Sequence, residues 1–271
     1  MATFKHLPIL FLIFFQLQKV FGLLKENELQ KAFVTYDSKA DKLSIVTSEP
    51  IDYVAKADFQ NSVNSTCWSY LDVTTNPQYN DSMQAYAAGM VEGFLTKELI
   101  QYSWQNTAAD YCTQPYNQYC KNLQKFLTQN YNWVKTEITQ NFDSPFWHNV
   151  RLFYTQVSGL DAGFTGTPKQ VNYDVDVLGM FYILQLSGDL EDLESVLHKP
   201  QKSHVLGSGS CSAIVKLTPG NKDLYVAQDT WTGFNEMLRV LKRYNFAYRM
   251  SETSSDLKHE TYYKVLYLKI V

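Results

Sequence analysis

The segment around Cys211 constrains the fold of this chain more than any other feature. Two glycines and three serines surround the cysteine, and residues 211–217 then alternate in the manner of a half-buried strand. The sequence Thr218-Pro219-Gly220-Asn221 predicts a turn, and residues 224–227 predict a returning strand. We therefore expect a β-hairpin that begins at Cys211.

The same segment has the composition of a self-processing site. Cleavage between Ser210 and Cys211 would leave Cys211 with an α-amino group beside its thiol. A thiol needs a base to become a good nucleophile, and an α-amino group, with a reference pKa of about 8, can act as that base. Gly207 and Gly209 allow the backbone to bend so that the thiol reaches the preceding carbonyl. This is the logic of hydrolases with an N-terminal nucleophile, but a buried cysteine beside a Gly/Ser loop is the commoner use of such a sequence.

Composition excludes several classes of function. Of the 271 residues, 45% are hydrophobic and 15% aromatic, as in globular proteins. The net charge of −3 and the lack of a basic run exclude nucleic acid as a partner. No Cys/His spacing suits a metal site, and the five histidines are scattered. Solvation and the dipole of a helix start explain the acidic residues better than a calcium site does; they are Asp189, Glu191, Asp192 and Glu194.

The amino terminus predicts entry into the secretory pathway. A short apolar run, residues 7–15, precedes the small residue Gly22, so we expect a signal peptide over residues 1–22; a membrane anchor is the alternative. No later segment approaches the roughly 20 apolar residues of a membrane-spanning helix. Two sequons, at Asn64 and Asn80, predict glycosylation and fit this route.

Two of the four cysteines are close in sequence. Cys112 and Cys120 would close a small loop in an oxidising compartment, which leaves Cys67 and Cys211. Further patterns predict regular elements along the chain. We expect a hairpin over 32–36 and 42–46, a strand at 68–73, helices over 82–104 (capped by Ser82), 119–138 and 146–156, a stop to regular structure at 159–168, a short acidic helix at 188–193, a linker over 199–209 and a helix from 234 towards 246.

Eight stretches of this chain occur in the same order in one family of secreted and lysosomal proteins. They are residues 68–71, 84–89 with Glu92, 104–107, 111–112 with Cys120, 147–152, 159–160, 186–193 and 207–215. On these stretches the chain resembles the phospholipase B-like family of the N-terminal nucleophile superfamily. The resemblance covers most of residues 30–246, and after Phe246 the chain no longer looks like the family.

The resemblance implies an α+β fold, an αββα sandwich that is incomplete here. It implies a helix-rich amino-terminal fragment over residues 23–210 and the start of a truncated catalytic portion over 211–271. A cut before Cys211 would expose the active site, and Cys112 and Cys120 would form a disulfide. The implied activity is hydrolysis of acyl bonds in phospholipids, without a cofactor and with peripheral lipid contact, in a secreted or lysosomal protein.

The resemblance and the chemistry of a thiol nucleophile together suggest roles around the hairpin. Cys211 would be the nucleophile, and Asp229 or Thr230 would orient its amine. Trp231 would border the acyl pocket or pack the hairpin. Gln228 stands where the family usually has histidine; glutamine forms hydrogen bonds but carries no proton as an imidazolium does. The oxyanion donors are expected downstream of the chain end.

Two other functions stay open at this point. An amidase acting on N-acyl lipids or peptides would use the same nucleophile. A non-catalytic secreted glycoprotein would fit Gln228 and the missing carboxy-terminal part.

Overall fold

The computed structural model describes residues 27–200, 210–231 and 233–267. The expected signal peptide, residues 1–22, and most of the expected linker, residues 201–209, lie outside the described residues. Helices and strands are both abundant, which confirms an α+β protein. Within the described residues, no helix is long and apolar enough to span a bilayer.

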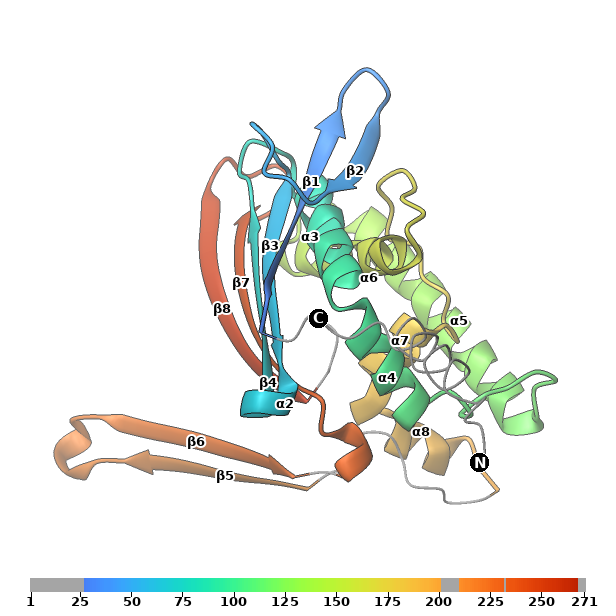
Figure 1. Cartoon of the computed structure of the whole chain (residues 1–271). Coiled ribbons are helices and arrows are strands. Elements are labelled where there is room, and N and C mark those ends of the chain that lie inside the picture. The colour runs from blue at the N-terminus through green and yellow to red at the C-terminus, as the bar shows by residue number, and fades with distance from the viewer. Residues whose placement is uncertain (1–26, 201–209, 232, 268–271) are drawn as a thin grey trace, which may run out of the picture.

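A six-stranded mixed sheet forms the centre of the fold (Figure 1). Its strand order is β2-β1-β3-β4-β7-β8, and all neighbours are antiparallel except β4 and β7, which are parallel. The strands are β1 (Leu29–Asp37), β2 (Lys42–Val46), β3 (Ala55–Ser62), β4 (Trp68–Thr75), β7 (Arg239–Arg249) and β8 (Leu257–Tyr267). The predicted hairpin at 32–46 and strand at 68–73 are confirmed as β1–β2 and β4; β3 and β8 were not predicted.

Helices cover one face of this sheet. Figure 1 shows α3 against the strands, with α6 beside it. Along β3 the buried residues alternate with half-buried ones, so that Ala57 and Phe59 face the helices while Lys56 and Asp58 lie on the other face. The helices are α2 (Val63–Thr66), α3 (Asp81–Leu95), α4 (Lys97–Thr107), α5 (Gln118–Gln140), α6 (Pro145–Thr165), α7 (Met180–Gln185) and α8 (Leu190–Val196).

Two helix predictions need correction at their ends. Asn80, not Ser82, caps α3, because the Asn80 side chain accepts a hydrogen bond from the backbone N–H of Met83 at 2.9 Å. The helix expected over 82–104 is two helices, since α3 ends at Leu95 and α4 begins at Lys97. The helices expected at 119–138, 146–156 and 188–193 are confirmed as α5, α6 and α8.

The expected stop at residues 159–168 was wrong, because α6 continues to Thr165. Its glycines let two helices touch backbone to backbone rather than ending the helix. A Cβ built on Gly159 would lie 2.0 Å from the carbonyl oxygen of Tyr86 in α3, and one on Gly163 would lie 2.1 Å from that of Met90. The glycines of α3 meet α6 in the same way. The four glycines at the crossing are Gly89, Gly93, Gly159 and Gly163.

The helix expected from residue 234 towards 246 was also wrong. A single 3-10 turn, Phe234–Glu236, leads into strand β7. In β7 every second residue, from Val240 through Lys242 and Tyr244 to Phe246, is buried against the helices. This period of two is that of a strand, and it outweighs the helical spacing of the apolar residues before it.

The predicted hairpin is confirmed as β5 (Ser210–Leu217) and β6 (Leu224–Trp231), joined by the 3-10 turn Pro219–Asn221. It forms a separate two-stranded sheet that extends away from the six-stranded one (Figure 1). From Cys211 to Leu217 and from Leu224 to Asp229, every residue is exposed. The second large sheet and second helical layer of an αββα sandwich stay a prediction.

Candidate active site

Cys211 lies at the beginning of β5 and is exposed to solvent. Ser210 precedes it in the same strand, where it pairs with Trp231 of β6, so the bond expected to be cut lies at the end of a regular ladder. Cleavage between Ser210 and Cys211 stays a prediction.

The register of the hairpin separates the residues expected beside Cys211. Thr230 pairs directly with Cys211, and Gln228 pairs with Ala213, two residues further along. Since side chains alternate along a strand, Gln228 lies on the same face as Cys211. Asp229 pairs with Ser212 and therefore lies on the opposite face. The side chains of Ser210, Thr230 and Trp231 lie outside the described part, so their expected roles stay predictions.

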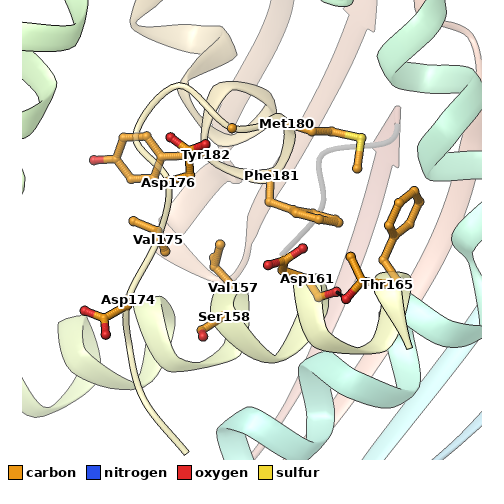
Figure 2. A pocket seen from close by; sticks show the side chains of 12 residues that line it. Val157, Ser158, Asp161, Thr165, Asp174, Val175, Asp176, Met180, Phe181 and Tyr182 are labelled. Atoms are coloured by element: carbon orange, nitrogen blue, oxygen red, sulfur yellow. Dashed lines mark hydrogen bonds between the residues drawn. The ribbon is translucent and has the colours of Figure 1, made fainter. Parts of the chain in front are cut away.

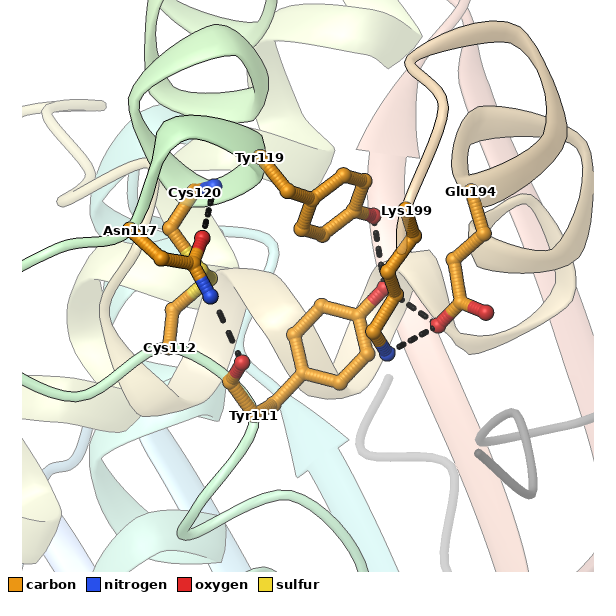
Figure 3. Close-up of a disulfide and its surroundings, with 7 residues drawn as sticks. All are labelled: Tyr111, Cys112, Asn117, Tyr119, Cys120, Glu194 and Lys199. Carbon is orange, nitrogen blue, oxygen red and sulfur yellow. Dashed lines mark hydrogen bonds and ion pairs between the residues drawn. A yellow bond between two sulfur atoms is a disulfide. The ribbon is translucent and has the colours of Figure 1, made fainter. Parts of the chain in front are cut away.

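The predicted disulfide is present and lies near Lys199, which follows α8 in the chain. Cys112 and Cys120 are joined at a Cα separation of 5.8 Å (Figure 3). Beside it, the ammonium of Lys199 lies 4.2 Å from the centre of the Tyr111 ring and 2.6 Å from an oxygen of Glu194. The loop between the two cysteines contains a cis Gln114–Pro115 bond.

Glu194 corrects one reading of the acidic helix. Its side chain is only 6% exposed, and it accepts hydrogen bonds from Lys199 and from the Tyr111 hydroxyl at 2.8 Å, so solvation does not explain it. Burial, together with the neighbouring Tyr119 and Glu194, raises the pKa of Tyr111 well above its ordinary value. Asp189, Glu191 and Asp192 are exposed, as expected of a solvated helix start.

A buried charge network joins the start of α3 to the end of β7. Asp81 accepts hydrogen bonds from the backbone N–H of Arg249 at 2.7 Å and from its guanidinium at 2.8 Å, and it bonds His148 at 2.9 Å. Burial by itself raises the pKa of the Asp81 carboxyl, but the bonds from His148 and Arg249 outweigh it and lower the pKa overall. On the far side of His148, Arg151 pairs with Glu252.

A second network crosses the core between α3 and β7. Glu92 is fully buried. It accepts one hydrogen bond from the ammonium of Lys242 at 2.6 Å and another from the Tyr244 hydroxyl at 3.0 Å. Burial raises the pKa of Tyr244 well above its ordinary value. Sequence reasoning missed both networks because the partners that join different elements lie between 67 and 168 residues apart in the chain. The available sequence signal was a charged residue at a position whose neighbours in the helix or strand pattern are buried, as with Glu92 in α3 and Lys242 in β7.

A hollow of about 260 Å³ lies between α6 and the start of α7 (Figure 2). Its walls combine aromatic side chains, among them Phe181 and Tyr182, with three carboxylates, those of Asp161, Asp174 and Asp176. Burial raises the pKa of Asp161. None of the residues that line the hollow belongs to the hairpin, so it adds nothing to the site around Cys211. Among the described residues, no group of three His, Cys, Asp or Glu side chains is arranged to hold a metal ion.

Both expected glycosylation positions are exposed. Asn64 lies in the single-turn helix α2, and Asn80 lies at the cap of α3. Exposure is necessary for a glycan in the folded protein, and both positions meet that condition.

Comparison with known proteins adds the family. The family model described as "Phospholipase B" matches residues 55–263, so the match continues past Phe246, where the resemblance had been expected to end. Proteins named "Putative phospholipase B-like 2" are similar to this chain: the mouse protein is 44% identical over 79% of the chain, and the human protein 44% identical over 80%. The "Putative phospholipase B-like 2" of Caenorhabditis elegans is 39% identical over 72%.

The matched region is part of longer relatives. It spans 36% of the mouse protein and 37% of the human protein, so the chain covers little more than a third of their length. The family model, however, covers most of this chain, including both networks and the hairpin with Cys211. The chain belongs to the phospholipase B-like family.

Proposed function

We propose that this chain forms part of a phospholipase B-like acyl hydrolase in which Cys211 is the nucleophile. The observation that carries the proposal is the position of Cys211, which is exposed at the beginning of β5 in a member of this family. A cut before Cys211 would make it the first residue of a strand, with its amine and thiol both open to solvent.

The cut itself requires only groups of the chain and water. The Cys211 thiol attacks the carbonyl carbon of Ser210; the S–C bond forms, the C–N bond breaks, and the proton passes to the departing nitrogen. Water then hydrolyses this thioester, which leaves a carboxylate on Ser210 and a thiol and an amine on Cys211.

Acyl hydrolysis would follow the same chemistry. The amine of Cys211 takes the proton of the thiol as the sulfur attacks the ester carbonyl. When the tetrahedral intermediate collapses, the C–O bond breaks and the amine returns the proton to the leaving alcohol. Water attacks the resulting thioester, the S–C bond breaks, and the fatty acid and the thiol are released.

The hairpin register refines the roles of the neighbouring residues. Gln228 lies on the face of Cys211, where its amide can hold a substrate oxygen by a hydrogen bond. Asp229 lies on the other face of the hairpin, whereas Thr230 pairs directly with Cys211. Of these two, Thr230 is therefore the better candidate for orienting the amine.

A second candidate is a non-catalytic secreted glycoprotein. It is favoured by Gln228, which cannot carry a proton, and by the hairpin, whose described side chains are exposed on both faces. An amidase acting on N-acyl substrates is a third possibility with the same nucleophile.

One experiment separates catalysis from its absence. The chain is expressed in a secretory host, and its internal amino termini are sequenced in the parent, Cys211→Ser and Cys211→Ala forms. We expect a new terminus at residue 211 in the parent, slower cutting in the serine variant and none in the alanine variant. An intact parent chain, or equal cutting in the alanine variant, would refute the proposal. Matched phospholipid and N-acyl substrates then distinguish ester from amide hydrolysis.

Secretory entry is part of this proposal. Residues 1–22 would direct the chain into the secretory pathway, towards secretion or a lysosome, and Asn64 and Asn80 would be glycosylated there. The exposure of both asparagines and the disulfide between Cys112 and Cys120 support this route.

A further inference from the structure

The second sequon lies in the wall of a hollow on the surface. This hollow has a volume of about 430 Å³, in the range of small-molecule sites. Three segments that are far apart in the chain line it: the β1–β2 hairpin, the start of α3 and residues 169–171. Figure 1 shows the β1–β2 hairpin beside the upper end of α3.

The cap of α3 fixes the direction of the Asn80 side chain. Its Oδ1 accepts the hydrogen bond from the backbone N–H of Met83, so the amide plane is held in one orientation. The Nδ2 atom, which is the atom that carries an N-linked sugar, makes no hydrogen bond to any described residue. The modification would therefore leave the helix cap intact, since the cap uses only the oxygen.

The lining of the hollow suits a carbohydrate. Sugars present apolar ring faces together with hydroxyl groups that donate and accept hydrogen bonds. The hollow offers the ring of Tyr36 and apolar surface from Val171. It also offers the exposed side chains of Lys169 and Gln170, which have no hydrogen bond to the described residues.

We propose that the first sugars of the oligosaccharide on Asn80, a modification that belongs to the proposed function, lie in this hollow, against Tyr36 and beside Lys169 and Gln170. In this arrangement the glycan ties the β1–β2 hairpin to the start of α3. The reaction uses a polyprenyl-diphosphate-linked oligosaccharide and a transferase of the host. The bond from Nδ2 to C1 of the first sugar forms, the bond from C1 to the diphosphate oxygen breaks, the amide loses a proton, and the lipid diphosphate leaves.

The inference rests on secretory entry but not on the chemistry of Cys211. To keep the two apart, the full chain is directed into the secretory pathway of a mammalian cell by a proven leader in place of residues 1–22. Mass spectrometry of its peptides measures occupancy at Asn80 and Asn64. The rate at which an amidase removes each glycan from the folded protein then measures how far each core is protected.

We expect Asn80 to be occupied and its glycan to be removed about tenfold more slowly than that of Asn64, a difference equivalent to about 1.4 kcal/mol. The double variant K169A/Q170A should raise the rate at Asn80 towards that at Asn64 and leave the rate at Asn64 unchanged. Both side chains are exposed, so this variant keeps the fold. The variant Ser82→Ala removes the sequon but leaves the hydrogen bond from Met83 to Asn80 in place, and it should expose backbone amides of the β1–β2 turn to faster hydrogen exchange.

Three results would overturn the inference. They are an unmodified Asn80 in secreted protein, equal removal rates at the two asparagines in the folded chain, and an unchanged rate at Asn80 in the K169A/Q170A variant. None of these depends on whether the chain is cut at Cys211, because a Cys211→Ala chain can be tested in the same way.

Discussion

Replacing Gly89 by alanine tests the backbone contact between α3 and α6. The added Cβ would lie 2.0 Å from the carbonyl oxygen of Gln156 and 2.6 Å from the nitrogen of Leu160. Both are backbone atoms, so no side-chain rotation relieves the clash. Ordinary contact begins at 3.4 Å, and 3.4 minus 2.0 is 1.4 Å, which is the shift that the helices would need. Separating α3 and α6 by that distance would remove much of the van der Waals contact between them.

The magnitude follows from two opposing effects. Alanine favours a helix over glycine by about 1 kcal/mol, whereas overpacking a core costs about 1–3 kcal/mol and here also separates two helices. Because no side-chain rotation relieves the clash, we expect the upper end of the overpacking cost and a net loss of about 2 kcal/mol in the free energy of unfolding. For a chain of this size that lowers the melting temperature by roughly 4–8 °C.

Thermal and urea unfolding, followed by circular dichroism, measure this loss. The control is Gly166→Ala, at the carboxyl end of α6, where φ is +71° and no atom lies within 4 Å of the new Cβ. There the cost is backbone strain alone, about 1 kcal/mol. If Gly89→Ala is as stable as the parent, or gains the helix propensity of alanine, the argument for a backbone-to-backbone crossing is wrong.

Three further predictions concern buried charges and the disulfide. Glu92→Gln should lower the free energy of unfolding in urea by about 3–5 kcal/mol, because it removes the carboxylate partner of the buried Lys242. The double variant Glu92→Met with Lys242→Met should recover most of that loss. A cost of less than about 1 kcal/mol for Glu92→Gln would contradict the prediction. The pKa of Asp81 is lowered in the folded state, so its contribution to stability is fully present above the unfolded pKa of about 3.9 and is lost as the pH falls through the folded pKa. In Asp81→Asn the free energy of unfolding should therefore fall less steeply between neutral and acid pH. An unchanged pH dependence of stability would refute this. Cys112→Ser with Cys120→Ser should cost about 2–3 kcal/mol in melting experiments, and a reductant should destabilise the parent but not the variant.

Sequence patterns predicted the elements whose signal is local. The hairpin after Cys211 has an alternating first strand and a Pro-Gly-Asn turn before the second, so its two strands follow from neighbouring residues. The disulfide was predictable for the same reason, since its two cysteines are eight residues apart. The candidate nucleophile also lies where the pattern placed it, at the beginning of a strand.

The elements that were missed depend on distant partners. The alternation in β7 is hidden by Lys242, a charged residue at a buried position, whose charge is compensated by Glu92 in α3. In the sequence alone, Gly159 suggests the end of a helix. Its actual role is close contact with the backbone of Tyr86 in another helix, which no local pattern indicates. The faces of Gln228 and Asp229 relative to Cys211 became clear only once the register of the hairpin was known.

The parallel pairing of β4 with β7 determines what scission at residue 211 would do to the whole molecule. Strand β7 lies after the cut in sequence but between β4 and β8 in the sheet, so each product holds strands that the other needs. Hydrogen bonds along six residue pairs, from Ser69 with Val240 to Thr74 with Asn245, bridge the two products. A nicked molecule would therefore keep the mobility of the intact one in a native gel and come apart only in detergent or denaturant.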